Sequence, residues 1–123
     1  MKYLFGGLLF VAAGLFWGCN GIEMARDGKT AYAIIRNTNA TPAEIFAAKE
    51  LSAFLEKATG AKFAVISETN QPLPQKAIYV GWTDFAGRHA DLSKLGAEDW
   101  IIKTKDKNLI LAGGRPRGTL YAV

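Results

Sequence analysis

A single helix with both ends marked is the strongest constraint on this chain, in the stretch TPAEIFAAKELSAFLEKATG at residues 41–60. Thr41 is a favourable N-cap, Pro42 suits the first helical position, and Glu44 completes a Thr-x-x-Glu capping box. Gly60 suits the left-handed residue that ends many helices. Apolar side chains recur at three- and four-residue spacing, at Ile45, Ala48, Leu51, Leu55 and Ala58. This stripe must pack on a sheet or another helix, and the charged side chains, Glu44 included, are expected mainly outside it.

Short apolar runs before and after this helix predict a sheet. Strands are expected at residues 30–36, 62–68 and 77–82, and residues 100–104 are expected to pair with residues 109–113 as a hairpin. The intervening residues 83–97 are expected to be irregular, with room for a helical turn, and a closing helix is expected from Pro116 or Arg117. The order β-α-β-β-β-β-α predicts a two-layer α+β sandwich, with a mixed sheet of about five strands and helices mainly on one face.

The closing helix has room for only about two turns before residue 123, whereas helices of globular proteins usually run for three or more. We therefore expect the printed sequence to be the front end of a longer protein, interrupted within its last helix.

Composition excludes several classes of protein. Half of the residues are apolar and 21% are charged, which is typical of a folded domain. The net charge is +4, but the basic residues alternate with acidic ones and form no basic run. A nucleic-acid partner is therefore not expected. Cys19 and His89 are the only cysteine and histidine, so no disulfide framework or zinc site can be assembled, and neither a metal nor another cofactor is expected.

Residues 1–19 have the layout of an export signal, with Lys2, an uncharged apolar run, and Cys19 at its end. A small residue followed by cysteine resembles the bacterial lipobox, although Phe16 and Trp17 stand where lipoboxes usually carry leucine and a small residue. Two interpretations are open: a lipid attached to Cys19, or an ordinary signal cleaved a little downstream. We favour the lipid.

Both interpretations imply an exported protein. With the lipid, the chain is a membrane-anchored lipoprotein of the cell envelope, in the periplasm or at the cell surface. Residues 20–29 are expected to form a linker, and residues 30–123 a folded domain.

The sequence carries no recognisable catalytic constellation. The spacing of its acidic residues gives none of them a catalytic partner, and such residues are usually solvated surface. His89 lacks a partner that would make it a base or a ligand. The stretch GGRPRG at residues 113–118 lacks the Gly-Lys-Ser/Thr of a phosphate loop. We expect no catalytic residue in this chain.

Three residues are candidates for contact with carbohydrate or with a neighbouring domain. Trp82 ends an expected strand and can stack on a sugar ring. Arg115 and Arg117 can each bind a carboxylate, from a sugar acid or from a neighbouring domain. The competing interpretation, which we favour for all three, is packing or solvation.

Several stretches together resemble a known family: ELSAFLEKATGAKFAVI, KAIYVGWTDFA, DLSKLGAEDWIIKTKDKNLILAGG and the exit RPRGTLYAV. Residues 30–123 resemble the N-terminal accessory domain of family 67 alpha-glucuronidases and related secreted bacterial proteins, and the fold is similar to the second domain of chitobiases and beta-hexosaminidases. This resemblance implies an α+β domain that precedes a TIM-barrel catalytic domain, whose barrel carries the acids that cleave the glycosidic bond.

We therefore expect a non-catalytic N-terminal domain of an exported glycoside hydrolase, alpha-glucuronidase-like or hexosaminidase-like, that takes part in polysaccharide degradation. Its expected partners are the downstream catalytic domain of the same chain, an oligo- or polysaccharide, and a membrane through the lipid anchor. The alternative is a stand-alone carbohydrate-binding or structural surface module without catalysis.

Overall fold

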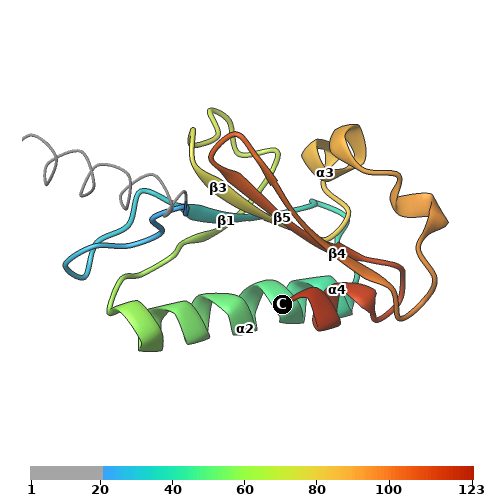
Figure 1. Cartoon of the computed structure of the whole chain (residues 1–123), viewed down its shortest axis with the longest axis horizontal. Helices are drawn as coiled ribbons and strands as arrows, with labels where there is room; N and C mark the ends of the chain where they lie inside the picture. Colours follow the sequence, from blue (N-terminus) through green and yellow to red (C-terminus); the bar gives the residue numbers. More distant parts are fainter. Residues whose placement is uncertain (1–20) are drawn as a thin grey trace, which may run out of the picture.

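The computed structural model describes residues 21–123, and within them a mixed five-stranded sheet carries helices on both of its faces (Figure 1). In chain order the elements are β1 (Ala33–Arg36), α2 (Pro42–Thr59), β2 (Val65–Ser67), β3 (Ala77–Val80), α3 (Asp84–His89), the short 3₁₀ helix η1 (Leu92–Lys94), β4 (Trp100–Lys105), β5 (Asn108–Gly113) and α4 (Gly118–Ala122). The expected α+β sandwich is confirmed.

The strands lie in the order β2-β1-β3-β5-β4. The first four in this order run parallel, and β4 pairs antiparallel with β5 at the edge. The predicted hairpin is confirmed with its register, since Trp100 pairs with Gly113 and Thr104 pairs with Leu109. Asp106 turns the hairpin with a φ of 57°, a conformation that tight hairpin turns require.

Both ends of α2 are as predicted. The Thr41 hydroxyl accepts a hydrogen bond from the Glu44 N–H at 3.3 Å, and the Glu44 carboxylate accepts one from the Thr41 N–H at 3.0 Å. Gly60 ends the helix at a φ of 73°, and its N–H donates to the Glu56 carbonyl. These bonds satisfy backbone groups that would otherwise be unpaired at the helix ends.

The face that α2 buries matches the predicted stripe only in part, because Ala48 is buried and Leu51 and Leu55 pack against the core, whereas Ala58 is exposed. Glu44, Ala47 and Ala48 are the buried residues of this helix, whereas Ile45 is 40% exposed. The prediction that Glu44 lies outside the buried face is wrong, because this carboxylate has a partner in a distant segment. The small alanine side chains allow the helix to lie close to the sheet at this point.

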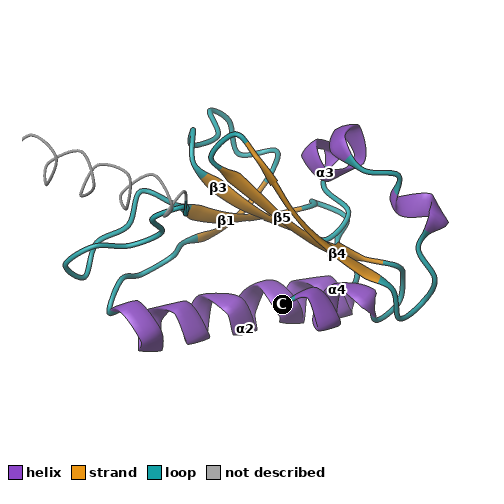
Figure 2. Ribbon diagram, viewed as in Figure 1, coloured by secondary structure: helices purple, strands orange, loops and turns teal. Residues whose placement is uncertain are grey.

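The sheet separates two apolar cores (Figure 2). On one face, α2 and α4 cover side chains of the central strands that include Ile34, Ile78 and Leu111. On the other face, Ala86 of α3 and Leu92 cover a second set. The segment expected to be irregular therefore contains a helix, and its Thr83 cap accepts from the Ala86 N–H. Strands buried on both faces explain the nearly continuous apolar runs of the sequence.

The segment before the sheet also contributes to packing. Ile22, Met24 and Ala25, from the stretch expected to be a linker, pack against the core under α2. The Thr30 hydroxyl donates to the Met24 carbonyl and accepts from the Tyr32 N–H, which holds this segment against the start of the sheet.

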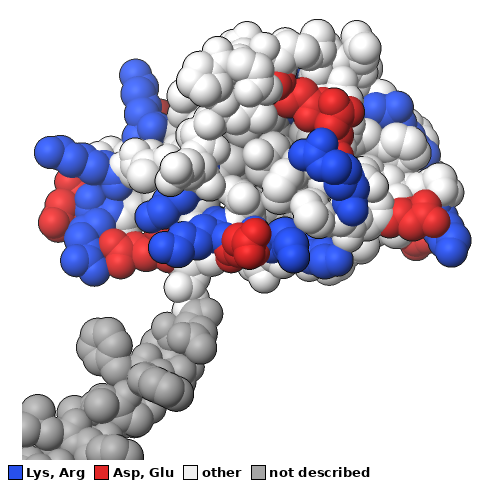
Figure 3. All heavy atoms as spheres, turned by 90° about the horizontal axis from the view of Figure 1, so that it is seen from above, with Lys and Arg blue, Asp and Glu red and all other residues white. Residues whose placement is uncertain are grey.

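Basic and acidic side chains are mixed over the surface that Figure 3 presents. No patch of a single sign extends across that face. Among residues 21–123, none of the helices combines the length and the apolar character needed to cross a bilayer.

The exit from β5 into α4 is built on an unusually close approach of two backbone segments. A Cβ added to Gly113 would lie 2.1 Å from the carbonyl carbon of Gly118. The Gly113 N–H donates to the Thr119 hydroxyl at 3.1 Å, a bond that ties the first turn of α4 to the end of the strand. Only glycine permits this contact, because both surfaces are main chain.

We expect Gly113→Ala to lower the free energy of unfolding by roughly 2–3 kcal/mol, because the added methyl group forces the two backbone segments apart. Gly87→Ala is the matched control, since a Cβ at that helical position meets no atom within 4 Å. The control should leave stability unchanged or raise it by up to about 1 kcal/mol. Urea unfolding followed by tryptophan fluorescence measures both values, and equal stability of the two variants would contradict the close-approach argument.

Candidate functional site

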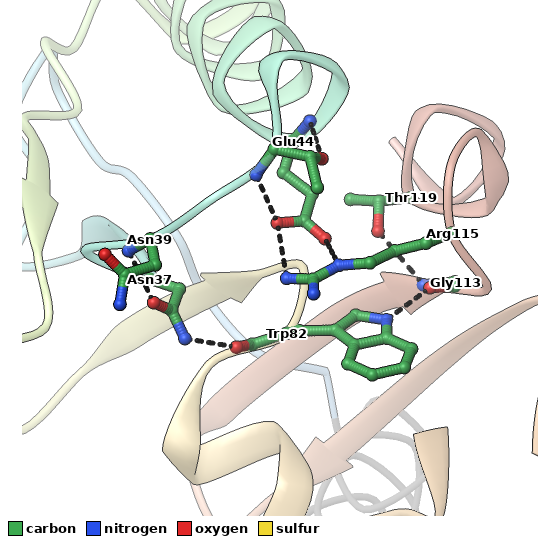
Figure 4. A network of polar contacts seen from close by, with 8 residues as sticks. Asn37, Asn39, Glu44, Trp82, Gly113, Arg115 and Thr119 are labelled. Atoms are coloured by element: carbon green, nitrogen blue, oxygen red, sulfur yellow. Dashed lines mark hydrogen bonds and ion pairs between the residues drawn. The ribbon is translucent and has the colours of Figure 1, made fainter. Parts of the chain in front are cut away.

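The loops that follow three parallel strands meet at one edge of the sheet. Asn37 follows β1, Trp82 follows β3, and Arg115 follows β5 (Figure 4). This is the edge at which open parallel sheets most often bind ligands. Two of the three candidates for contact with carbohydrate or a neighbouring domain, Trp82 and Arg115, lie here.

Arg115 is engaged by a buried carboxylate. Its Nε donates to Glu44 Oε1 at 2.9 Å, and its Nη2 donates to Glu44 Oε2 at 3.4 Å. The Glu44 side chain is 1% exposed, and it also accepts from the Thr41 N–H. The first turn of α2 stabilises this negative charge further, since a helix N-terminus carries partial positive charge.

Trp82 completes the cluster. The Arg115 guanidinium lies over its ring, 4.5 Å from the centroid, in a cation–π contact. The indole N–H donates to the Gly113 carbonyl at 2.7 Å, and the Trp82 carbonyl accepts from the Asn37 side chain at 2.6 Å. We call Glu44, Trp82 and Arg115 the exit latch, because they join α2 to the segment that leads into α4.

The remaining predicted residues lie elsewhere. Arg117 pairs with Glu98 at 2.8 Å, and both side chains are largely exposed. The structure therefore does not bring Arg117 to Trp82. Cys19, the predicted site of lipid attachment, lies outside the described residues. Contact of Trp82, Arg115 or Arg117 with a sugar or with another domain stays a prediction.

A second group of polar side chains lines a pocket of about 670 Å³ at the same edge of the sheet, on the face that α3 covers. Tyr79 forms its buried wall, and Glu68, Asp84 and Arg88 add charged groups. Sequence reasoning missed this pocket, because its residues come from the ends of three strands and from α3.

Tyr79 and Glu68 are the two residues of this pocket whose pKa is raised. Burial raises the pKa of Tyr79, which the charge of Arg88 partly offsets. Burial also raises the pKa of Glu68, while the hydrogen bond from the Asp84 N–H at 2.8 Å and the charge of Arg88 act in the opposite direction. The Asp84 carboxylate adds to the rise through repulsion.

The chemistry available to the two groups differs. The exit latch satisfies its own charges, and no buried side-chain nitrogen or oxygen of residues 21–123 lacks a partner. Within the same residues, no three His, Cys, Asp or Glu side chains gather as a metal site would require. The latch therefore has the chemistry of a structural joint, and the pocket has that of a polar recess open to solvent.

The two arginines of the exit segment provide a matched test of the latch. Arg115→Ala leaves the Glu44 charge buried without its partner, so we expect a loss of roughly 2–4 kcal/mol in the free energy of unfolding. Arg117→Ala removes an exposed pair, and we expect a loss of at most about 1 kcal/mol. Urea unfolding of both variants measures the difference, and equal losses would show that the latch is no more than a surface contact.

The raised pKa of Glu68 makes stability dependent on pH. The folded chain holds the Glu68 proton more tightly than the unfolded chain, whose reference value is 4.5. The associated stabilisation is present below that value and is lost as the pH rises through the higher folded pKa. Glu68→Gln keeps an acceptor for the Asp84 N–H and removes the titration. We expect the variant to gain stability relative to the original chain as pH rises through this window, and parallel profiles in thermal unfolding would contradict it.

Comparison with known proteins identifies the family of this chain. No curated protein matches this sequence. The family model described as glycosyl hydrolase family 67 N-terminus matches residues 22–123, which include every strand and helix described above. The match confirms the resemblance noted in the sequence, and the chain belongs to the glycosyl hydrolase family 67 N-terminus family.

Proposed function

We propose that this domain is the N-terminal accessory domain of an exported glycoside hydrolase and that it orients a catalytic domain following in the same chain. The observation that carries the proposal is the rigid attachment of the exit segment. The Glu44–Arg115 pair joins residues 71 positions apart in the sequence. The Gly113–Gly118 approach and the Thr119 bond fix the start of α4 on the sheet.

A rigid exit matters for a domain that precedes another. A flexible connection would let the two domains reorient freely, whereas a helix anchored at its first turn transmits one orientation to whatever follows it. Here the anchor contacts α2, the longest helix of residues 21–123, as well as the end of β5.

The layer formed by α2 and α4 leaves large apolar side chains exposed beside this exit. Their exposure supports the proposal of a neighbouring domain. Ile102 of the edge strand β4 is 55% exposed, and Trp100 and Tyr121 are exposed to a similar degree. Ile102 pairs with Leu111, whose side chain belongs to the core under α2 and α4. Ile102 therefore lies on the face of the sheet that α2 and α4 cover. We propose that α4 continues beyond residue 123 and that this continuation, with the domain after it, covers these side chains.

Export, the lipid on Cys19 and a polysaccharide substrate belong to the same proposal. Their support is the signal-like pattern of residues 1–19 and the family to which the domain belongs. In this scheme the acids that cleave the glycosidic bond lie on the following domain.

The coding DNA beyond Val123 tests the proposal first. We expect the reading frame to continue through a catalytic domain in which acidic residues follow the strands of a barrel. A stop codon directly after Val123 would contradict the proposal and favour the alternative, a stand-alone carbohydrate-binding or structural surface module.

In the longer protein, we expect Ile102→Asp to weaken docking, because a carboxylate would be placed where an apolar contact forms. Hydrogen exchange should become faster in α4 and in the segment after it. Val65→Asp is the matched control: Val65 is an exposed apolar residue on the opposite edge strand, on the same face of the sheet. Equal effects of the two variants would argue against a domain docked beside β4.

A further inference from the structure

We propose that the pocket walled by Tyr79 binds a neutral sugar unit, through the unpaired Tyr79 hydroxyl and Glu68 carboxylate oxygen and through the polar side chains that surround them. We call this recess the Tyr79 pocket; the lining residues that carry the argument are Asn37, Thr38, Glu68, Gln71, Tyr79 and Arg88. The proposal goes beyond the accessory role, because it holds whether or not a catalytic domain follows.

The position of the pocket follows from the topology of the sheet. The neighbouring strands β1 and β3 run parallel, and their chains leave in opposite directions. β1 leads to α2, which covers one face, whereas β3 leads to α3, which covers the other. The two diverging connections leave a crevice at the carboxyl ends of the strands, which is where open sheets bind ligands. Its volume of about 670 Å³ lies within the range of small-molecule sites.

The buried wall of this crevice holds an unpartnered polar group. Tyr79 is only 5% exposed, and its ring stacks on Phe85 with centroids 4.2 Å apart. Tyr79 lines the pocket, and its hydroxyl has no hydrogen-bond partner among residues 21–123. Since no buried side-chain oxygen of these residues lacks a partner, the hydroxyl is reached by solvent, and a ligand hydroxyl can replace the water there.

Glu68 presents a second free atom beside it. One carboxylate oxygen accepts from the Asp84 N–H, and that bond orients the side chain and leaves Oε1 without a partner among the described residues. The Gln71 side chain donates to the Glu68 carbonyl at 3.1 Å, so the backbone is held as well. Partial burial raises the pKa of Glu68 and that of Tyr79.

The rim of the pocket is organised before any ligand arrives. The Thr38 hydroxyl lies 2.7 Å from the Ser67 hydroxyl, which links the loops after β1 and β2. The Asn37 side chain accepts from the Asn39 N–H and donates to the Trp82 carbonyl. Preorganised polar groups bind more tightly, since less conformational freedom is lost on binding.

The mixture of groups selects the class of ligand. Arg88 only donates hydrogen bonds, Glu68 only accepts them, and hydroxyl and amide side chains do both. Sugar hydroxyls match such a mixture, because each one can donate and accept at once. Glu68 and Asp84 together outweigh the single positive charge of Arg88, so an anion is repelled. A neutral sugar is therefore favoured over a sugar acid.

The larger hollow along α3 and η1, of about 890 Å³, carries no comparable argument. Several of its polar groups already have partners: Thr83 caps α3, the Trp82 indole donates to the Gly113 carbonyl, and Ser93 donates to Asp91.

The test is a titration of the full chain by NMR with D-glucose, D-galactose, D-xylose and N-acetyl-D-glucosamine, and with D-glucuronate as the charged counterpart of glucose. We expect at least one neutral sugar to bind with a dissociation constant in the millimolar range and to shift the Tyr79 ring signals. D-glucuronate should bind more weakly than D-glucose. Tyr79→Phe keeps the stacked ring and removes the hydroxyl, and we expect it to weaken binding by about 10-fold.

Tyr32→Phe is the matched control. Tyr32 is also 5% exposed, but its hydroxyl already donates to the Lys107 carbonyl at 2.6 Å, outside the Tyr79 pocket. The control should lose stability without losing sugar affinity, which separates binding from folding. Failure of all four neutral sugars to bind, or binding that Tyr79→Phe leaves unchanged, would overturn the inference. Neither result would bear on the accessory role, which the reading frame tests separately.

Discussion

The ion pair between Glu44 and Arg115 is the contact on which the rest of this structure depends. A carboxylate removed from water costs several kcal/mol unless a partner compensates it, and here the partner lies 71 residues away. The pair is complete only when the first turn of α2 and the loop after β5 are in place together. The Trp82 ring lies against the guanidinium and shields one of its faces. This one interaction thereby couples α2 to the segment between β5 and α4.

The same edge of the sheet contains two groups with opposite properties. The charged groups of the exit latch pair with each other, and this pairing holds the segment that leads into α4. The Tyr79 pocket, on the other face, keeps a hydroxyl and a carboxylate oxygen free. The connections after β1 and β3 lead to opposite faces of the sheet. The latch joins the first turn of α2 to the loop after β5, with Trp82 from the connection between β3 and α3, whereas the pocket lies beside the shorter α3.

The site was less predictable than the fold. Trp82 is a candidate from its position at a strand end and Arg115 from its ability to bind a carboxylate, and the structure brings the two into contact. Glu44, the partner of Arg115, is recognisable in the sequence only as a capping residue. The capping box explains one of its oxygens and does not predict the arginine. The Tyr79 pocket had no sequence signal at all, because a strand tyrosine, a loop glutamate and a helical arginine form no motif along the chain.

What the sequence determined by itself is local: the caps of α2, the hairpin and its register, and the approximate positions of the strands. Each depends on residues a few positions apart, whose backbone preferences and hydrogen bonds act within one turn or one hairpin. Only the tertiary structure decided which face of α2 is buried, which arginine holds Glu44, and where the unpaired hydroxyl of Tyr79 lies. Those outcomes depend on the solvation and partners of side chains brought together from distant segments, and a buried charge or hydroxyl selects its partner through three-dimensional proximity.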